Sequence, residues 1–224
     1  MSSKISVIMS VYNDENRVSS AIESILDQSY ENFEFLILDD CSSDGTKNVI
    51  NRYNNDSRIR IYSNAKNLGL TKSLNKLINI SKGKYIFRQD SDDISFSKRF
   101  EKQITILENK NVKVCTTRAI NIKNNKIIPG VTSWFPKKIT MKFKNPYIHG
   151  TLAIDKNFLN LLGNYSEEYY YSQDFKLYMD IFKKNEKIFE IKEPLYYLNT
   201  YNNISTNFRL QQNFYFKKAL YKNG

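Results

Sequence analysis

The chain of 224 residues is long enough to bury a hydrophobic core of its own, and its 41% hydrophobic and 25% charged residues exclude a wholly disordered protein. Two widely separated cysteines, Cys41 and Cys115, exclude a disulfide scaffold and a cysteine zinc site. Because no stretch of the sequence approaches the roughly 20 apolar residues of a membrane-spanning helix, we expect a cytoplasmic protein, free or attached peripherally to the inner face of the cell membrane.

The first half of the chain alternates predicted strands with predicted helices. Segments typical of strands occur at 5–9, 33–38, 58–62, 84–87 and 112–116. Between them, apolar residues recur at helical spacing around 18–26, 49–53, 74–78 and 100–107. This alternation predicts right-handed crossovers and an α/β fold with a Rossmann-like, mostly parallel sheet flanked by helices.

The second half is less regular, and a small mixed region followed by a helical tail is expected there. We predict a hairpin over 120–128, a helix that begins near Asp174, and short strands at 188–191 and 195–198. A helix with mixed aromatic and basic residues is predicted over 205–221. Without an internal repeat or a flexible linker, the chain is expected to form one domain over 1–200, with halves at 1–116 and 117–200, and a basic aromatic tail over 201–224.

Charge is distributed unevenly along the chain. Residues 1–108 hold 15 of the 34 basic and 15 of the 23 acidic residues, so the whole excess of +11 falls in 109–224. The stretch 109–154 contains nine basic residues and no acidic residue. Such a one-sided field indicates an anionic partner, either a lipid surface, a phosphate-bearing acceptor or a nucleic acid. A solvated basic face without a partner is the alternative.

Polar clusters follow three of the predicted strands. They comprise residues 10–13, Asp39-Asp40, and residues 90–93, which include the carboxylates of Asp90, Asp92 and Asp93. In a parallel sheet, ligands bind beyond the carboxyl ends of the strands. Three carboxylates within four residues repel each other, and oxygen ligands select hard cations such as Mg²⁺ or Mn²⁺. The alternative is an acidic N-terminus for the next helix, but the position at a strand end favours a metal.

A resemblance to a known family rests on three segments in order: KISVIMSVYNDENRVSSAIESILDQSYENFEFLILDDCSSDGT, NLGLTKSLN and GKYIFRQDSDDIS. Together they resemble the inverting glycosyltransferases of family 2, which have an A-type nucleotide-binding fold. The resemblance covers residues 4 to about 200. It implies a nucleotide-diphosphate sugar donor, usually linked to uridine, and a metal that bridges the diphosphate. Residues 1–116 would then bind the nucleotide sugar, and residues 117–200 the acceptor.

The resemblance also implies roles for individual residues. Ser10 and Tyr12 would border the nucleobase, although many relatives have proline where this chain has Ser10. The Asp40 carboxylate would accept a hydrogen bond from the base, whereas its residue type alone also fits a turn-closing role. Asp90 would begin the DxD motif. Asp92 would touch ribose or metal, and Asp93 would hold the metal.

The match is looser in the second half, over HGTLAIDKNFLNLLGNYSEEYYYSQDFKLYMDIFKKNEKIFEIKEPLYYL. The usual Glu-Asp pair before the helix appears here as Gln173-Asp174, so Asp174 would be the catalytic base without its acidic neighbour. His149 lies where relatives often have a histidine near the diphosphate, or it is a structural residue. Arg99 would reach the diphosphate, or it is a surface charge on the fourth helix.

These expectations describe a metal-dependent hexosyl- or N-acetylhexosaminyltransferase. It would act on a glycan or lipid-linked acceptor in bacterial surface polysaccharide synthesis, at an anionic membrane surface and without a nucleic-acid partner. Two alternatives remain. A sugar nucleotidylyltransferase would carry a glycine-rich loop after the first strand, where this chain has SVYNDENR. A nucleic-acid-binding module would explain the basic second half, but it leaves the aspartate cluster unexplained.

Overall fold

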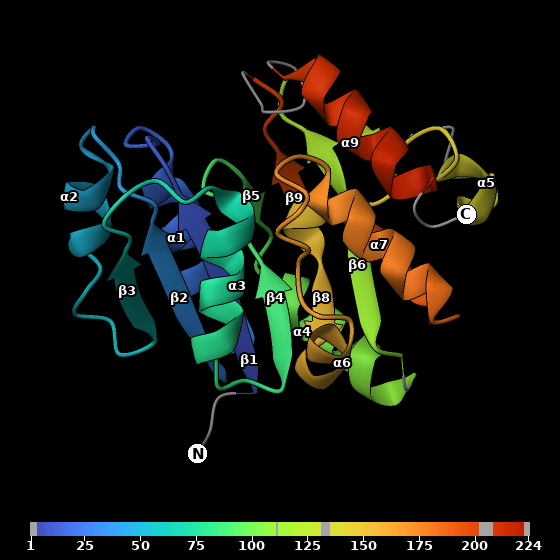
Figure 1. The fold of residues 1–224 in the computed structure, drawn as a ribbon. Helices are drawn as coiled ribbons and strands as arrows, with labels where there is room; N and C mark the ends of the chain where they lie inside the picture. Colours follow the sequence, from blue (N-terminus) through green and yellow to red (C-terminus); the bar gives the residue numbers. More distant parts are fainter. Residues whose placement is uncertain (1–3, 111, 131–134, 202–207, 222–224) are drawn as a thin grey trace.

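The computed structural model describes residues 4–110, 112–130, 135–201 and 208–221 (Figure 1). Its first half is the predicted parallel sheet. Four parallel strands lie in the order β3 (Ile59–Ser63), β2 (Phe33–Asp39), β1 (Ile5–Val11) and β4 (Tyr85–Arg88). The helices between them are α1 (Val18–Leu26), α2 (Thr46–Asn51) and α3 (Leu70–Ile80). Each agrees with a predicted element to within a few residues.

Beyond β4 the sheet becomes mixed. Strand β8 (Ala153–Asp155) pairs antiparallel with both β4 and β6 (Val114–Asn121). Next to β6 runs the parallel strand β9 (Ile188–Leu198), and β5 (Ile94–Ser95) forms the edge. The predicted hairpin is confirmed, because β7 (Lys126–Ile128) folds back on β6. The described strands therefore form a single sheet with a Rossmann-like parallel half, as predicted.

The prediction of two short strands around Pro194 is wrong. Residues 188–198 form one strand, and its pairing with β6 shifts register where Pro194 lies opposite Arg118. A proline cannot donate a ladder hydrogen bond, and such residues are tolerated at bulges. The interruption seen in the sequence is therefore a bulge within a continuous strand.

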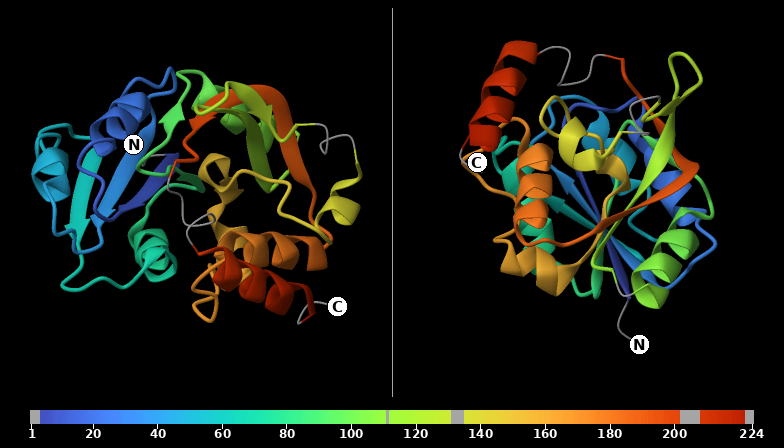
Figure 2. Two further views of the ribbon diagram at one scale, coloured as in Figure 1. Left: turned by 90° about the horizontal axis from the view of Figure 1, so that it is seen from above. Right: turned by 90° about the vertical axis from the view of Figure 1, so that its right-hand side faces the viewer.

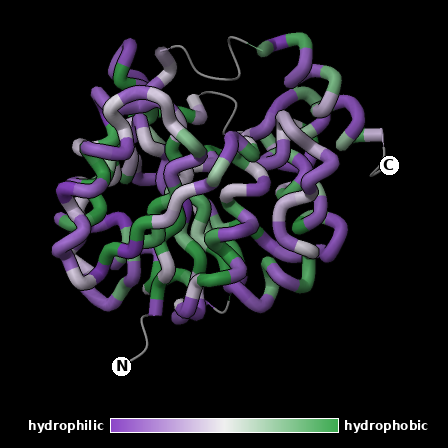
Figure 3. The backbone as a smooth tube through the Cα atoms, turned by 60° about the vertical axis from the view of Figure 1, so that its left-hand side comes forward, coloured by the Kyte–Doolittle hydropathy of each residue, from purple (hydrophilic) through white to green (hydrophobic). Residues whose placement is uncertain are grey.

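Helices cover both faces of the sheet. Successive residues of β1 point to opposite faces, so Ile8 packs with α3 and α7 (Gln173–Lys183), whereas Val7 and Met9 pack with α1 and α4 (Arg99–Asn109). Burial on both faces explains the continuous apolar runs of the central strands. Figure 3 shows these hydrophobic segments gathered in the middle of the molecule.

The remaining short elements lie in the second half. They are α5 (Lys137–Thr140), the 3₁₀ turn η2 (His149–Thr151) and α6 (Lys156–Leu161). The C-terminal helix α9 (Arg209–Tyr221) runs beside α7 (Figures 1 and 2). Residues 205–207 of the predicted tail helix lie outside the described residues. The Phe216 ring stacks on that of Phe175 at 4.1 Å between centroids, so α9 packs on the domain.

Candidate active site

The three polar clusters predicted at strand ends lie on one edge of the sheet. Strands β1, β2 and β4 are adjacent and parallel, with Val11 paired to Asp39 and Ile8 to Arg88. Backbone hydrogen bonds continue past the strands, because the Asp40 amide donates to the Val11 carbonyl at 2.8 Å and the Gln89 amide to the Ile8 carbonyl at 3.2 Å. The clusters after these strands are therefore neighbours in space.

Asp40 is buried and holds the loop between β3 and α3. Its carboxylate accepts hydrogen bonds from the backbone amides of Leu68 at 2.9 Å and Gly69 at 2.8 Å, and from the Asn64 side chain at 2.7 Å. Gly69 has a φ of 83°, a conformation that favours glycine. On β1, Ser10 is partly buried and the Tyr12 ring is 51% exposed. Asp40 thus fixes the shape of the loop beside the end of β1.

The carboxylates after β4 face different surroundings. Asp90 is paired with the fully buried guanidinium of Arg88. Asp92 is partly exposed, with Arg17 Nη1 at 3.5 Å and Asn199 Nδ2 at 3.2 Å from its Oδ2. Asp93 is 2% exposed, and its Oδ1 accepts a hydrogen bond of 2.6 Å from the backbone amide of Asn199. Arg17 and Arg88 therefore neutralise part of a cluster that the sequence presented as purely acidic.

Burial and mutual repulsion make these carboxylates hard to ionise. Burial, followed by the charge of Asp90, raises the pKa of Asp92 to about 6, while Arg17 opposes the change. Burial and the charges of Asp90 and Asp92 also raise the pKa of Asp93. A cation bound at this position would favour the ionised forms.

The aspartate cluster offers a divalent cation only part of a coordination shell. Within the described ranges, no three His, Cys, Asp or Glu side chains come together as a metal site. Mg²⁺ commonly takes one or two carboxylates and completes its shell with water and substrate phosphates. Asp92 fits that role best, since it is partly exposed, whereas Asp93 lies buried against the Asn199 amide. The donor set is compatible with a cation brought together with a diphosphate.

Asp174 occupies the first turn of α7, where acidic residues are favoured. Its Oδ2 accepts a hydrogen bond of 2.7 Å from the Asn145 side chain. Nearby, His149 Nε2 lies 2.7 Å from the Tyr165 hydroxyl. Burial, with the charge of Arg88, lowers the pKa of His149 to about 3, so its imidazole is neutral at physiological pH. A neutral imidazole can donate a hydrogen bond but brings no positive charge to a diphosphate.

Charged groups from both halves of the chain influence the pKa of the Tyr165 hydroxyl. Burial raises the pKa of Tyr165, Arg88 opposes this rise, and the carboxylates of Asp174 and Asp90 add to it. Asp90 and Asp174 come from different halves of the chain, yet both lie within electrostatic range of Tyr165. The pKa of Tyr165 thus responds to carboxylates from both halves of the chain.

Both expectations for Arg99 are wrong. The side chain is fully buried, and its guanidinium donates hydrogen bonds to the carbonyls of Gly150 at 2.8 Å and Arg88 at 3.0 Å. It lies over the rings of Phe100 and Tyr196, at 5.0 and 5.2 Å from their centroids. Burial lowers its pKa to about 10, so it remains charged near neutrality. Arg99 joins α4, β4 and η2 from within and is not presented to a diphosphate.

Several site residues were not predicted from the sequence. Asp14 accepts hydrogen bonds from Ser91 Oγ at 2.7 Å and Arg17 Nε at 2.5 Å, which ties the loop after β1 to the aspartate cluster. Extending the strand-end argument by a few residues beyond Asn13 would have included Asp14 and Arg17. Asn199 gave no such signal, because it contacts the cluster from 106 residues away in the sequence.

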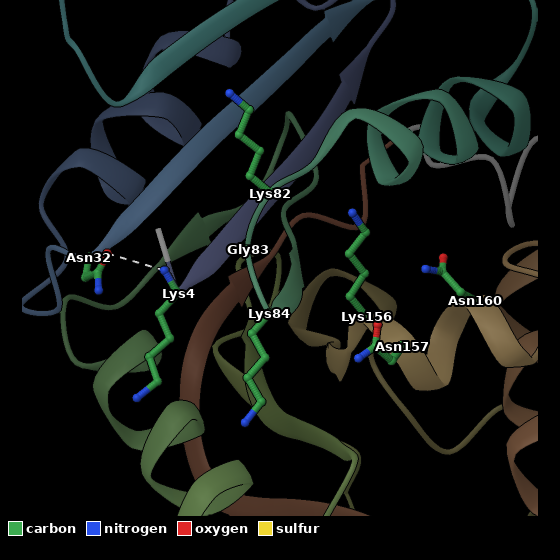
Figure 4. Close-up of a pocket in the computed structure, with 8 residues that line it drawn as sticks. All are labelled: Lys4, Asn32, Lys82, Gly83, Lys84, Lys156, Asn157 and Asn160. Carbon is green, nitrogen blue, oxygen red and sulfur yellow. Dashed lines mark hydrogen bonds between the residues drawn. The ribbon is translucent and has the colours of Figure 1, made fainter. Parts of the chain in front are cut away.

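A surface pocket of about 560 Å³ lies elsewhere (Figure 4). It includes Lys4 and Lys84, which directly precede β1 and β4, so it opens at the amino ends of the strands, opposite the aspartate cluster. The lysine side chains on its walls point in different directions (Figure 4). Lys4 is paired with Glu108, and Lys156 donates to the Ser81 carbonyl. These ammonium groups do not converge on a common ligand position.

Comparison with known proteins identifies relatives over most of the chain. The sequence model described as "Glycosyl transferase family 2" matches residues 6–178. The chain is 33% identical over 184 residues to the UDP-Glc:alpha-D-GlcNAc-diphosphoundecaprenol beta-1,3-glucosyltransferase WfgD of Escherichia coli. This match covers 81% of this chain and 70% of WfgD.

Two solved structures share the fold. The structure of Staphylococcus aureus TarS 1–349 in complex with UDP-GlcNAc matches with a TM-score of 0.77 and 20% identity, over 89% of this chain and 59% of that one. The mannosyltransferase PcManGT of Pyrobaculum calidifontis, in complex with GDP-Man and Mn²⁺, matches with a TM-score of 0.77 and 14% identity. That match covers 98% of this chain and 63% of PcManGT. The chain thus spans less than two thirds of the length of these two structures.

Proposed function

Because this chain belongs to family 2 of the glycosyltransferases, we propose that it transfers a sugar from a nucleotide-diphosphate donor to a glycan or lipid-linked acceptor, with inversion at the anomeric carbon. The observation that carries this proposal is the carboxylate cluster at the carboxyl ends of the parallel strands, where Asp90 pairs with Arg88 and Asp92 lies partly exposed. A donor-side carboxylate cluster and an acceptor-side base are the two parts that a direct displacement requires.

The donor is proposed to be a uridine-linked hexose or N-acetylhexosamine. WfgD is named for UDP-Glc, and the TarS structure was solved with UDP-GlcNAc. The nucleobase would lie at the end of β1, bordered by Ser10 and by the half-exposed ring of Tyr12. Asp40 supports the proposed base site by fixing the adjacent loop through the Leu68 and Gly69 amides.

The diphosphate is proposed to lie at the aspartate cluster with Mn²⁺ or Mg²⁺. Asp92 would be the main metal ligand, with Asp93 behind it and Asp90 oriented by Arg88. Bound there, the cation would offset the negative charge that develops on the leaving nucleoside diphosphate. Arg17 already lies 3.5 Å from Asp92 and would add positive charge at the same place.

Asp174 is proposed to be the general base. Asn145 holds one of its oxygens, which sets the plane of the carboxylate. The base would take the proton of the acceptor hydroxyl as the hydroxyl oxygen attacks the anomeric carbon. Such general base catalysis typically raises the reaction rate by roughly 10²–10⁴-fold. A single base with no covalent intermediate predicts inversion of configuration. Gln173, where relatives usually have glutamate, leaves Asp174 without an acidic neighbour at that position.

Bacterial surface polysaccharide synthesis is the proposed setting, since WfgD is named for an acceptor linked to diphosphoundecaprenol. We propose that the basic second half docks on the anionic membrane that carries such an acceptor. Exposed apolar side chains accompany the lysines near α5 and on α9, including Phe143 at 77%, Leu210 at 82% and Phe214 at 65% exposure. Trp134 lies outside the described residues. None of the helices described here has the length and apolar character needed to cross a membrane.

The experiment that tests the proposal is turnover of an Asp174→Asn variant with a UDP-sugar, Mn²⁺ and a lipid-linked acceptor. We expect the variant to bind donor normally by calorimetry and to lose at least ~100-fold in transfer rate. Asp180→Asn is the matched control, since Asp180 lies on the same helix paired with Lys176. Near-normal transfer by Asp174→Asn would place the base elsewhere, with Glu167 or Glu168 next in line. Release of pyrophosphate would instead identify a nucleotidylyltransferase.

A further inference from the structure

The start of α7 has an unusual N-cap. Ser172 is 5% exposed and adopts a left-handed conformation, with φ 54° and ψ 27°. A serine at this position normally accepts a hydrogen bond from a backbone amide of the first turn. Here its side chain makes no such bond. Instead, its hydroxyl donates to Gln212 Oε1 at 2.7 Å, with the Gln212 carbonyl as a second acceptor at 3.1 Å.

A second contact between α9 and the start of α7 lies one residue beyond Asp174. Phe175 is 1% exposed, and its ring stacks on Phe216 with an interplanar angle of 29°. Gln212 and Phe216 lie one helical turn apart and therefore on the same face of α9. Helix α9 thus holds the residues on both sides of the Gln173-Asp174 pair, through one hydrogen bond and one ring stack.

The left-handed conformation of Ser172 needs support from its surroundings. Residues other than glycine occupy this region at an energetic cost, and they keep it only where neighbouring contacts enforce it. The hydrogen bond to Gln212 is one such contact. Without it, the backbone at Ser172 is free to relax, and any relaxation rotates the first turn of α7, which carries Asp174.

We propose that α9 is a positioning element for Asp174, acting through the Ser172–Gln212 hydrogen bond and the Phe175–Phe216 stack. The inference rests on the proposed function, in which Asp174 is the base. It assigns to the C-terminal helix a part in the transfer step that its sequence, a basic aromatic tail, does not suggest. Displacement of a catalytic group by about 1 Å can cost on the order of 100-fold in rate.

Three variants test the hydrogen bond. Ser172→Ala removes the hydroxyl and leaves the left-handed conformation without this support, so we expect a fall of about 10- to 100-fold in kcat at unchanged donor KM. Gln212→Ala should lower kcat similarly, and Gln212→Glu, which keeps an acceptor oxygen, should restore it. Asn185→Gly is the control, because Asn185 has the same φ of 54° beyond the other end of α7, and its kcat should equal that of the wild type.

A measurement without turnover separates this inference from the proposed function. Hydrogen exchange of the amides at 173–177 should accelerate in Gln212→Ala and remain at the wild-type rate in Asn185→Gly. Unchanged exchange and unchanged kcat in both Ser172→Ala and Gln212→Ala would overturn the positioning role. So would a parallel loss of donor affinity and stability, which would indicate a general packing defect. Absence of transfer by the wild-type enzyme would instead count against the proposed function, whatever the exchange result.

Discussion

Replacing Asp92 by asparagine should have opposite effects on stability and on ligand binding. The folded protein raises the pKa of Asp92 from its ordinary value of 3.8 to about 6. A carboxyl group with a raised pKa favours folding in its neutral form, so the ionised Asp92 weakens the metal-free fold above pH 6 and has no such effect below pH 3.8. The Asp92→Asn variant removes this penalty, but it also removes the proposed metal ligand.

The size of the gain in stability follows from the pKa. A rise from 3.8 to about 6 corresponds to at most about 3 kcal/mol, at 1.36 kcal/mol per pKa unit. The attraction of Arg17, 3.5 Å away, already lowers this pKa and is therefore contained in the shift. The Asp92 side chain is 25% exposed, and screening by solvent reduces the expected gain to about 1–2 kcal/mol, which for a protein of this size raises the Tm by about 2–8 °C.

The assay is thermal unfolding without metal at pH 7.5, 5 and 4. The Asp92→Asn variant should be more stable than the wild type at pH 7.5, and the difference should vanish toward pH 4. Asp56→Asn is the matched control with the opposite sign, because hydrogen bonding to Arg58 lowers the pKa of Asp56. That control should lose stability at pH 7.5 and keep most of this loss down to pH 4, because the contribution of a lowered pKa fades only below the ordinary value of 3.8.

Calorimetry with UDP and Mn²⁺ completes the test. Metal-dependent binding should be lost in Asp92→Asn and retained in Asp56→Asn. For the wild type, binding should weaken as the pH falls through about 6, since the metal requires the ionised carboxylate. The reasoning is refuted if Asp92→Asn is less stable than the wild type at pH 7.5, or if it binds UDP and Mn²⁺ with wild-type affinity.

Three further predictions concern other parts of the molecule. The Arg99→Met substitution should lower the free energy of unfolding, measured in urea, by about 2–4 kcal/mol, because the carbonyls of Gly150 and Arg88 are left without their donor. A decrease of less than about 0.5 kcal/mol would contradict the buried role of Arg99. His149, the only histidine, should show no NMR titration between pH 5 and 8, since its pKa is lowered to about 3; a midpoint near 6.5 would contradict its burial. The protein should co-sediment with anionic vesicles but not with neutral ones. Salt at 1 M should release it, since the Debye length then falls to ~3 Å. Protein that stays in the supernatant with anionic vesicles at low salt would rule out membrane docking.

The sequence predicts the parallel half well because its signals are local. Strands β1, β2 and β4 are short, mostly apolar runs, β3 alternates apolar with polar residues, and each helix between them repeats its apolar residues at a spacing of three or four. Strand β8 was not predicted, since three residues are too few to show a period. Pro194 suggested a break in β9 that pairing with β6 overrides. Both misses come from contacts between distant segments.

The candidate site shows the same division. The positions of Asp40, Asp90 and Asp92 at strand ends follow from the sequence, but their partners do not. Arg99 shows why residue type can mislead. It lies beside Phe100 and one turn before Gln103, on the buried side of α4, yet arginine is usually exposed and was therefore assigned to the surface or to a ligand. Only the structure reveals the carbonyls that accept its hydrogen bonds.

The segment that leads to Asp174 is held from both halves of the molecule. From the first half of the chain, the Asn75 side chain of α3 pairs with the backbone of Tyr165 through two hydrogen bonds of 2.8 and 3.0 Å. Thr71, one turn earlier on α3, donates to the Tyr169 carbonyl at 3.1 Å.

The loop that precedes α3 is the one that Asp40 fixes at Gly69, where an added Cβ would come within 2.9 Å of the Tyr170 ring. A side chain of the second half of the chain therefore lies directly against the loop beside the proposed nucleobase site. The opposite side of the same segment is held by α9 through Ser172. Asp174 thus follows a segment anchored to the proposed donor site at one end and to the C-terminal helix at the other. This arrangement gives the Asp174 carboxylate, in the first turn of α7 directly after an irregular segment, the fixed geometry that general base catalysis requires.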